Sequence, residues 1–169
     1  MPLISYEHYF PKLAQDVFIA ADAYVIGNVE VRHSASVWYK SVLRGERGPI
    51  VVGAFSNIQE SCSVEGGETD PCLIGNYVTV GHGAILRECI IGDYSLIGMG
   101  SIIGKGVKIG ENCMIGAGTA IAEGRVIPAN SLVAGAAGRV IRKVTEAEIT
   151  AIQYSALGYQ KLSLQYCLK

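Results

Sequence analysis

Residues 91–133 read IGDYSLIGMGSIIGKGVKIGENCMIGAGTAIAEGRVIPANSLV, and this stretch decides the fold. An aliphatic side chain recurs in it at every sixth position. The recurring residues are Ile91, Ile97, Ile103, Ile109, Ile115, Ile121, Ile127 and Val133. Glycine directly follows the first five of them. A period of six fits neither an α-helix nor a plain β alternation, so it indicates a repeat architecture.

The same step continues toward the N-terminus, over residues 19–43, 52–64 and 74–86. The breaks at 44–51 and 65–73 both contain Gly and Pro, so they are interpreted as insertions. A six-residue step suits a solenoid with three short flat faces per coil. Its corners need residues that tolerate unusual backbone angles, which accounts for the glycines. The sequence therefore predicts an all-β fold, a parallel β-helix of hexapeptide repeats over about residues 10–135, within a single domain of residues 1–169.

The repeat ends near Val133 and a helical pattern follows it. Thr145 followed by Glu148 forms a capping box, which is a helix-start signal. Apolar residues then recur at helical spacing, at Ile149, Ile152, Ala156 and Tyr159. These features predict a C-terminal helix over about 145–166 that lies along the prism, covers an edge of the β-helix and contributes to an oligomer contact.

Composition excludes several classes of protein. The 169 residues carry 14 Lys and Arg against 15 Asp and Glu, so a generally basic, nucleic-acid-binding surface is excluded. No apolar run approaches the roughly 18 residues of a membrane span, and no signal pattern follows Met1. Five cysteines without a CxxC pair fit a reducing compartment. We therefore expect a cytoplasmic protein with neither a nucleic-acid nor a membrane partner.

Counting hexamers places polar residues in columns, because an insertion loops out without changing which face a hexamer occupies. Arg44, Glu65 and Arg87 each follow the aliphatic residue of hexamers that are three steps apart. They are expected to form a vertical Arg–Glu–Arg ladder at one corner, with neighbouring side chains close enough to pair. Such stacked charges are often simple cross-strand pairs, worth about 0.2–1 kcal/mol each.

A second column places Glu60 directly beneath His82, with Gln59 beside Glu60. Both long insertions and most of the unusual polar residues fall on these same coils, which favours a functional site over a structural role. His82 is the one histidine placed to act as a base, since His33 lies outside both columns and His8 precedes the repeat.

These stretches resemble the gamma-class carbonic anhydrases. The matching motifs are Arg44-Gly45-Glu46, Asn57-Ile58-Gln59-Glu60, Val78-Thr79-Val80-Gly81-His82, Leu96-Ile97-Gly98-Met99-Gly100 and a helical tail with Ser155-Ala156 and Tyr159. The resemblance implies a left-handed β-helix, a homotrimer and a zinc site between two subunits. In that family three histidines hold the metal, two stacked on one subunit and a third from its neighbour.

Mapped residue by residue, Glu65 and Arg87 occupy the positions of the two stacked histidines, and His82 matches the third. Zinc catalysis needs three protein ligands and an open position for water. Arginine cannot be deprotonated in a protein, so Arg87 repels a divalent ion instead of binding it. We therefore expect neither bound zinc nor any other cofactor, and no ordinary CO2 hydration. The candidate site residues are His82, Arg44, Arg87, Glu65, Glu60, Gln59 and Asn57.

Three functions stay open, and with them the question of enzymatic activity. In the first, the crevice of a degenerate carbonic anhydrase-like trimer binds a small anion such as bicarbonate or a carboxylate, or an inert ladder only stabilises the trimer. In the second, the chain is a hexapeptide-repeat acyltransferase that uses an acyl-CoA donor, with His82 as general base. In the third, it is a structural or assembly subunit.

Overall fold

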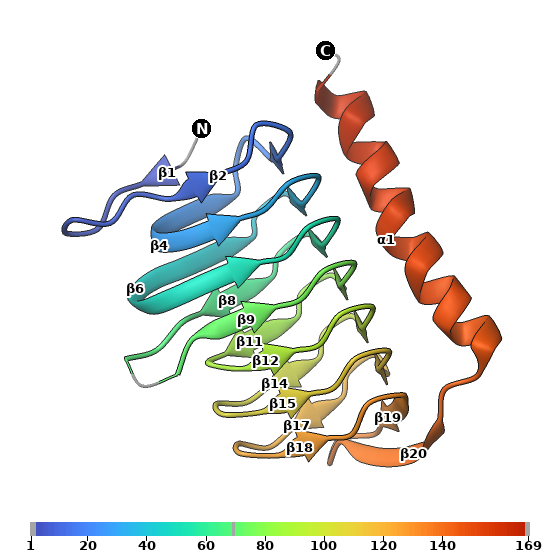
Figure 1. Ribbon diagram of the computed structural model, residues 1–169. Helices are drawn as coiled ribbons and strands as arrows, with labels where there is room; N and C mark the ends of the chain where they lie inside the picture. Colours follow the sequence, from blue (N-terminus) through green and yellow to red (C-terminus); the bar gives the residue numbers. More distant parts are fainter. Residues whose placement is uncertain (1–2, 69, 168–169) are drawn as a thin grey trace.

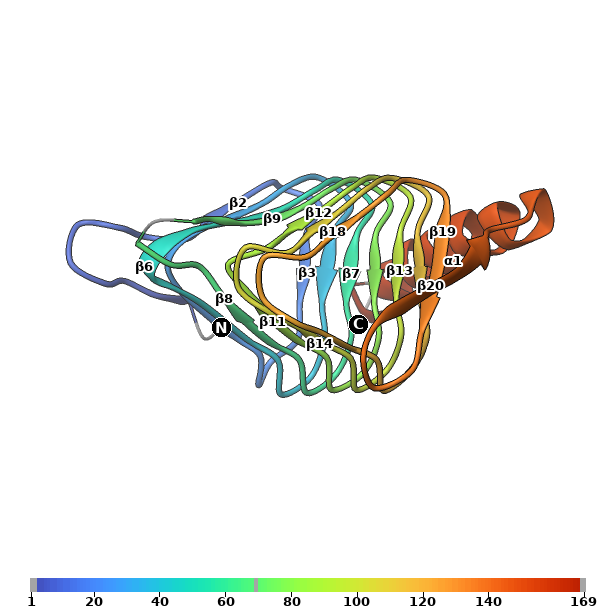
Figure 2. The same ribbon diagram turned by 90° about the horizontal axis from the view of Figure 1, so that it is seen from below.

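The computed structural model describes residues 3–68 and 70–167. The chain winds into a left-handed parallel β-helix of about seven coils, and the long helix α1 (Glu146–Cys167) runs beside it (Figure 1). Viewed from below, the coils nest inside one another and α1 lies outside the prism (Figure 2). The predicted β-helix of hexapeptide repeats with a C-terminal helix is confirmed.

Three columns of strands form the faces of the prism, and all pairings in them are parallel. Face 1 consists of β3 (Phe18–Ile19), β5 (Ser36–Val37), β7 (Asn57–Ile58), β10 (Thr79–Val80), β13 (Leu96–Ile97), β16 (Met114–Ile115) and β19 (Ser131–Ala134). Face 2 consists of β1 (Leu3–Ile4), the first halves of β4 (Tyr24–Val31) and β6 (Val42–Val52), β8 (Ser63–Glu65), β11 (Ile85–Arg87), β14 (Ile102–Ile103) and β17 (Ala120–Ile121). Face 3 consists of β2 (Lys12–Leu13), the second halves of β4 and β6, β9 (Cys72–Ile74), β12 (Ile90–Ile91), β15 (Lys108–Ile109) and β18 (Val126–Ile127).

The aliphatic residue of each hexamer fills the interior. Of the 19 aliphatic residues in the predicted phase, all but Ile19 are buried. Each stacks on its counterpart one coil away, as Leu43, Val64 and Leu86 do on face 2. The stacked aliphatic side chains give a continuous apolar core along the axis, and removing them from water is the main force that holds the solenoid together.

At Gly92, Gly98, Gly104 and Gly110, the glycine that follows the aliphatic residue allows close packing between coils. A Cβ at Gly98 would lie 2.5 Å from the backbone nitrogen of Ala117 in the next coil. Backbone with positive φ occurs at other corner positions instead, such as Gly118 (+66°) and Tyr77 (+54°). The expected reason for these glycines, unusual backbone angles, is therefore wrong at Gly98, and the reason there is the space between coils.

A short antiparallel strand, β20 (Arg139–Lys143), pairs with β19 and leads into α1. Thr145 and Glu148 form the predicted capping box, since the backbone N–H of each donates to the side chain of the other. α1 then packs on face 1 against β3, β5, β7 and β10. Trp38 is buried in that contact, with the rings of Tyr159 and Tyr166 each 5.4 Å away.

Among the described residues, no helix combines the length and the apolar composition that crossing a bilayer requires.

Candidate functional site

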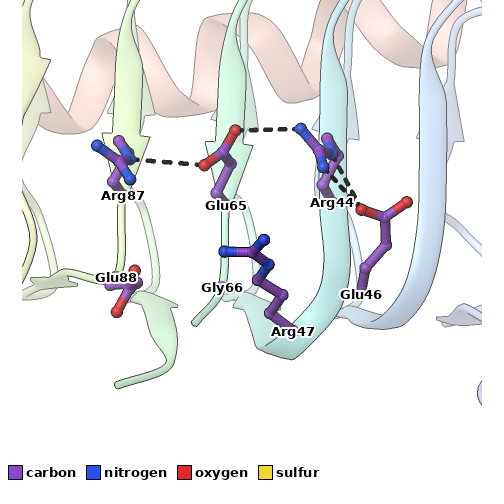
Figure 3. A pocket seen from close by; sticks show the side chains of 7 residues that line it. All are labelled: Arg44, Glu46, Arg47, Glu65, Gly66, Arg87 and Glu88. Carbon is purple, nitrogen blue, oxygen red and sulfur yellow. Dashed lines mark hydrogen bonds and ion pairs between the residues drawn. The ribbon is translucent and has the colours of Figure 1, made fainter. Parts of the chain in front are cut away.

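Arg44, Glu65 and Arg87 stand in register on β6, β8 and β11. Arg44 Nη1 donates a hydrogen bond to Glu65 Oε1 at 3.4 Å, and Arg87 Nε lies 3.5 Å from Glu65 Oε2 (Figure 3). The three side chains are 48%, 34% and 51% exposed. Ion pairs with this exposure are worth about 0–1 kcal/mol, so the ladder adds little to the stability of one subunit.

Each of the three nitrogens of the Arg44 guanidinium donates to a carboxylate. Its Nε and Nη2 donate to Glu46 Oε2 at 3.2 and 2.8 Å, while Nη1 donates to Glu65. The hydrogen bond and charge of Glu46, with a smaller contribution from Glu65, raise the pKa of Arg44. Arg44 is therefore held in place by Glu46 and Glu65, and three of its five N–H groups are already used.

A cavity of about 170 Å³ lies beside the ladder at the corner between faces 2 and 3. Its lining residues are Arg44, Glu46, Arg47, Glu65, Gly66, Arg87 and Glu88 (Figure 3). Arg47 and Glu88 were not among the site residues predicted from the sequence. Their positions in the sequence could have indicated both as site residues, because Arg47 lies in the first insertion and Glu88 follows Arg87 directly. Glu88 Oε2 lies 2.9 Å from Lys105 Nζ, so this carboxylate has a cationic partner outside the cavity.

His82 and Glu60 form the predicted pair on the turn between faces 1 and 2. His82 Nδ1 lies 2.6 Å from Glu60 Oε2. The His82 side chain is 46% exposed, so the ring is open to a partner on its other side. Burial raises the pKa of Tyr159 on α1, and the negative charge of Glu60 adds to the effect. The pair thus lies near α1 and Tyr159, at the opposite end of β11 from the Arg87 corner.

A buried hydrogen-bonded chain supports the His82 turn from behind. Ser155 Oγ of α1 lies 3.2 Å from Thr79 Oγ1, and that oxygen accepts from Asn57 Nδ2 at 3.0 Å. Gln59 Nε2 donates to Asn57 Oδ1 at 3.3 Å, and Gln59 Oε1 accepts from the backbone N–H of His82 at 3.2 Å. The predicted Asn57 and Gln59 therefore join His82 to α1. Thr79 and Ser155, which were not among the predicted site residues, complete this hydrogen-bonded series.

An apolar groove of about 360 Å³ lies between α1 and face 1. Leu96, Met99 and Met114 lie among its apolar residues, and Gln59, Thr79 and Ser155 supply its polar end. The polar end is next to the His82 turn, because Gly81 also lines the groove. Pockets with this composition, apolar walls and a few converging polar groups, are typical of small-molecule sites.

The side chains at the positions that the resemblance assigns to the zinc ligands do not fit a zinc ion. Arg87 is a fixed cation, and the carboxylate of Glu65 lies between two guanidiniums. Within residues 3–68 and 70–167, no three His, Cys, Asp or Glu side chains are grouped as a metal site. In a zinc site shared between subunits, this corner would have to supply two ligands. It supplies one carboxylate, Glu65, which is already paired with two arginines.

Comparisons with known proteins agree with this architecture. The family model described as "Bacterial transferase hexapeptide (six repeats)" matches residues 88–123. A Methanocaldococcus jannaschii protein named "Probable carbonic anhydrase" is 46% identical over 89% of this chain and 95% of its own length. "Gamma carbonic anhydrase 1, mitochondrial" of Arabidopsis thaliana is 35% identical over 90% of this chain, which spans 58% of that longer protein. The chain belongs to the gamma carbonic anhydrase-like family of hexapeptide-repeat proteins.

This gamma carbonic anhydrase-like chain also matches a solved transferase-family structure. A hexapeptide transferase family protein from Anaplasma phagocytophilum aligns with a TM-score of 0.91 and 36% identity, over 97% of each chain. The gamma carbonic anhydrase-like fold is therefore shared by proteins named for two different chemistries. The side chains of the site must decide between them.

Proposed function

We propose that this protein is a homotrimer whose inter-subunit crevice binds a small anion, bicarbonate or a carboxylate, and that it does not hydrate CO2 through zinc. One observation carries the proposal: Glu65 and Arg87, at the positions of the family's two stacked ligands, are paired with each other. A guanidinium at this position supplies the positive charge that a metal supplies in relatives. Unlike a metal, it has no open coordination position at which water can bind and be activated.

The outer surface of face 2 supports the assembly. Its outward column runs through Tyr24, Val42, Ser63, Ile85, Ile102 and Ala120, in register and without a charge. Tyr24, Ile85 and Ile102 are 46%, 38% and 48% exposed. The corresponding column of face 3 includes Lys12, Glu30 and Lys108. An uncharged column with exposed apolar side chains favours contact with further copies of the chain.

Packing of face 2 around a threefold axis brings its two corners together in neighbouring subunits. One corner carries Arg87 and the other carries His82. The terminal nitrogens of Arg87 then offer forked hydrogen bonds to a carboxylate or bicarbonate. Glu60 holds Nδ1 of His82, so Nε2 is the ring nitrogen left to hydrogen-bond with the anion.

Metal content and oligomeric state test this proposal together. Protein prepared without chelator is analysed for zinc, then incubated with zinc or cobalt, desalted and analysed again. Light scattering gives the mass, and calorimetry with bicarbonate and formate gives anion affinity. We expect a trimer with far less than one metal per subunit and measurable anion binding. Stoichiometric tight zinc, a monomer, or the absence of anion binding would each overturn the proposal.

The groove beside the His82 turn favours a second candidate function, acyl transfer from an acyl-CoA. Its apolar walls suit an acyl chain, and its polar end lies close to a histidine with a carboxylate partner. In that reaction His82 would remove a proton from the acceptor while the acyl group occupies the groove. Thermal denaturation with acetyl-CoA tests it, because a ligand at a hundred times its Kd stabilises by about 2.7 kcal/mol. An unchanged melting temperature at millimolar acetyl-CoA excludes this candidate.

A further inference from the structure

We infer that the guanidiniums of Arg47 and Arg87 of one subunit together bind the anion, and that Arg44 does not contact it. This inference rests on the proposed function, because it names the residues and the charge of the anion at the same corner. It follows from how the three arginines around the 170 Å³ cavity are engaged.

The first step is the exclusion of Arg44. All three of its nitrogens point to carboxylate oxygens, two at Glu46 and one at Glu65. A ligand anion at the two N–H groups that remain would also face the negative charges of Glu46 and Glu65, which already offset the charge of Arg44. Arg44 therefore acts as a positioning residue that fixes Glu46 and Glu65 at the wall of the cavity.

The second step concerns the two remaining arginines. Arg87 approaches Glu65 through Nε alone, at 3.5 Å, which leaves the terminal nitrogens of its exposed side chain available. No hydrogen bond or ion pair connects the guanidinium of Arg47 with another of the described residues. Figure 3 shows it turned into the space between Glu65, Glu88 and Arg87, with no dashed line. Both free guanidiniums thus line one cavity.

The third step gives the charge of the ligand. The cavity lining carries three positive charges, on Arg44, Arg47 and Arg87, and three negative charges, on Glu46, Glu65 and Glu88. A lining without net charge disfavours a multiply charged ligand, so the expected ligand is a monoanion. The cavity volume corresponds to roughly five or six water molecules at about 30 Å³ each, so the ligand is a small oxyanion such as formate or bicarbonate.

Titration of the full chain with sodium formate, sodium bicarbonate and sodium sulfate, at fixed pH and ionic strength, tests the inference by calorimetry. We expect Arg47→Gln and Arg87→Gln each to weaken formate binding at least tenfold. Arg32→Gln, which removes an exposed arginine outside the cavity, should leave it within twofold. Arg47→Lys keeps the charge without the forked geometry and should fall between Arg47→Gln and the wild type. Circular dichroism confirms that each variant is folded.

The outcomes separate the inference from the proposed function. If formate binding is lost in Arg87→Gln but kept in Arg47→Gln, the assignment of Arg47 to the anion site is wrong. Anion binding at the crevice would still stand. If sulfate binds tenfold more tightly than formate, the monoanion assignment is wrong. If the wild type binds none of the three anions at 50 mM, the proposed function fails and this inference fails with it.

Discussion

Glu65 stands beside Arg87 in the register of two parallel strands, with Arg87 Nε 3.5 Å from Glu65 Oε2. Twenty-two residues separate the two in the chain, and one coil of the solenoid brings them together. Under the proposed function, the two opposite charges of this pair stand at the positions that the resemblance assigns to two stacked metal ligands.

Replacing both residues should recreate a metal site. We predict that the double variant Glu65→His/Arg87→His binds about one zinc per subunit, because it restores three imidazoles once a neighbour supplies His82. Cobalt absorption and metal analysis after desalting measure the effect. The triple variant that also carries His82→Ala is the matched control and should lose most of the metal. A trimeric double variant that stays metal-free would show that His82 of the neighbour does not reach this corner.

Glu65→Gln should lower stability only slightly, by about 1 kcal/mol or less, because both of its ion pairs are partly exposed. It should raise formate affinity severalfold, since a carboxylate beside Arg87 disappears. Denaturant unfolding and calorimetry provide the two measurements, with Glu111→Gln, an exposed carboxylate elsewhere, as the control. Weaker formate binding in Glu65→Gln would contradict the role given to Arg87.

Thr79→Val should destabilise the protein by about 1–3 kcal/mol. The substitution leaves Asn57 Nδ2 without its acceptor in a place where Asn57 and Thr79 are 1% and 3% exposed. Chemical denaturation measures the change.

Thr119→Val is the matched control for Thr79→Val. Thr119 is buried too, but its Oγ1 has no hydrogen-bond partner in the described part of the chain. Its replacement by Val should be neutral or stabilising, since no bond is lost and a buried polar atom is removed. Equal destabilisation by both substitutions would mean that packing, and not the polar chain from Ser155 to His82, determines the effect.

Acid should weaken the start of α1. The hydrogen bonds from Arg142, followed by the backbone N–H of Thr145, lower the pKa of Glu148 from 4.5 to about 2. The folded state thus favours the ionised carboxylate, so its stabilising effect is complete above about pH 4.5 and is lost as the pH falls toward 2. Melting temperatures of the wild type and Glu148→Gln should differ at pH 7 and converge near pH 2. A difference that stays constant over this range would rule out the ionised cap.

The stacking of the site residues could be predicted because, in a β-helix, spacing along the sequence determines position in the structure. Each coil repeats the last, so residues three hexamers apart must stack once insertions are set aside. That is why the Arg44–Glu65–Arg87 ladder and the Glu60–His82 pair agree with the hexamer count. The cap at Thr145 was likewise local, because a capping box lies within four residues.

What the sequence by itself determined is the repeat, the buried aliphatic column, the helix start and the identity of the residues that stack. Only the tertiary structure decided which nitrogens remain free: Arg44 is bound by two carboxylates, while Arg47, from an insertion outside the hexamer count, points into the cavity. It also decided that Ser155 reaches Thr79, because the approach of α1 to face 1 depends on packing between distant segments. A periodic backbone fixes where a side chain starts. The direction in which a long, flexible arginine ends depends on all of its neighbours at once.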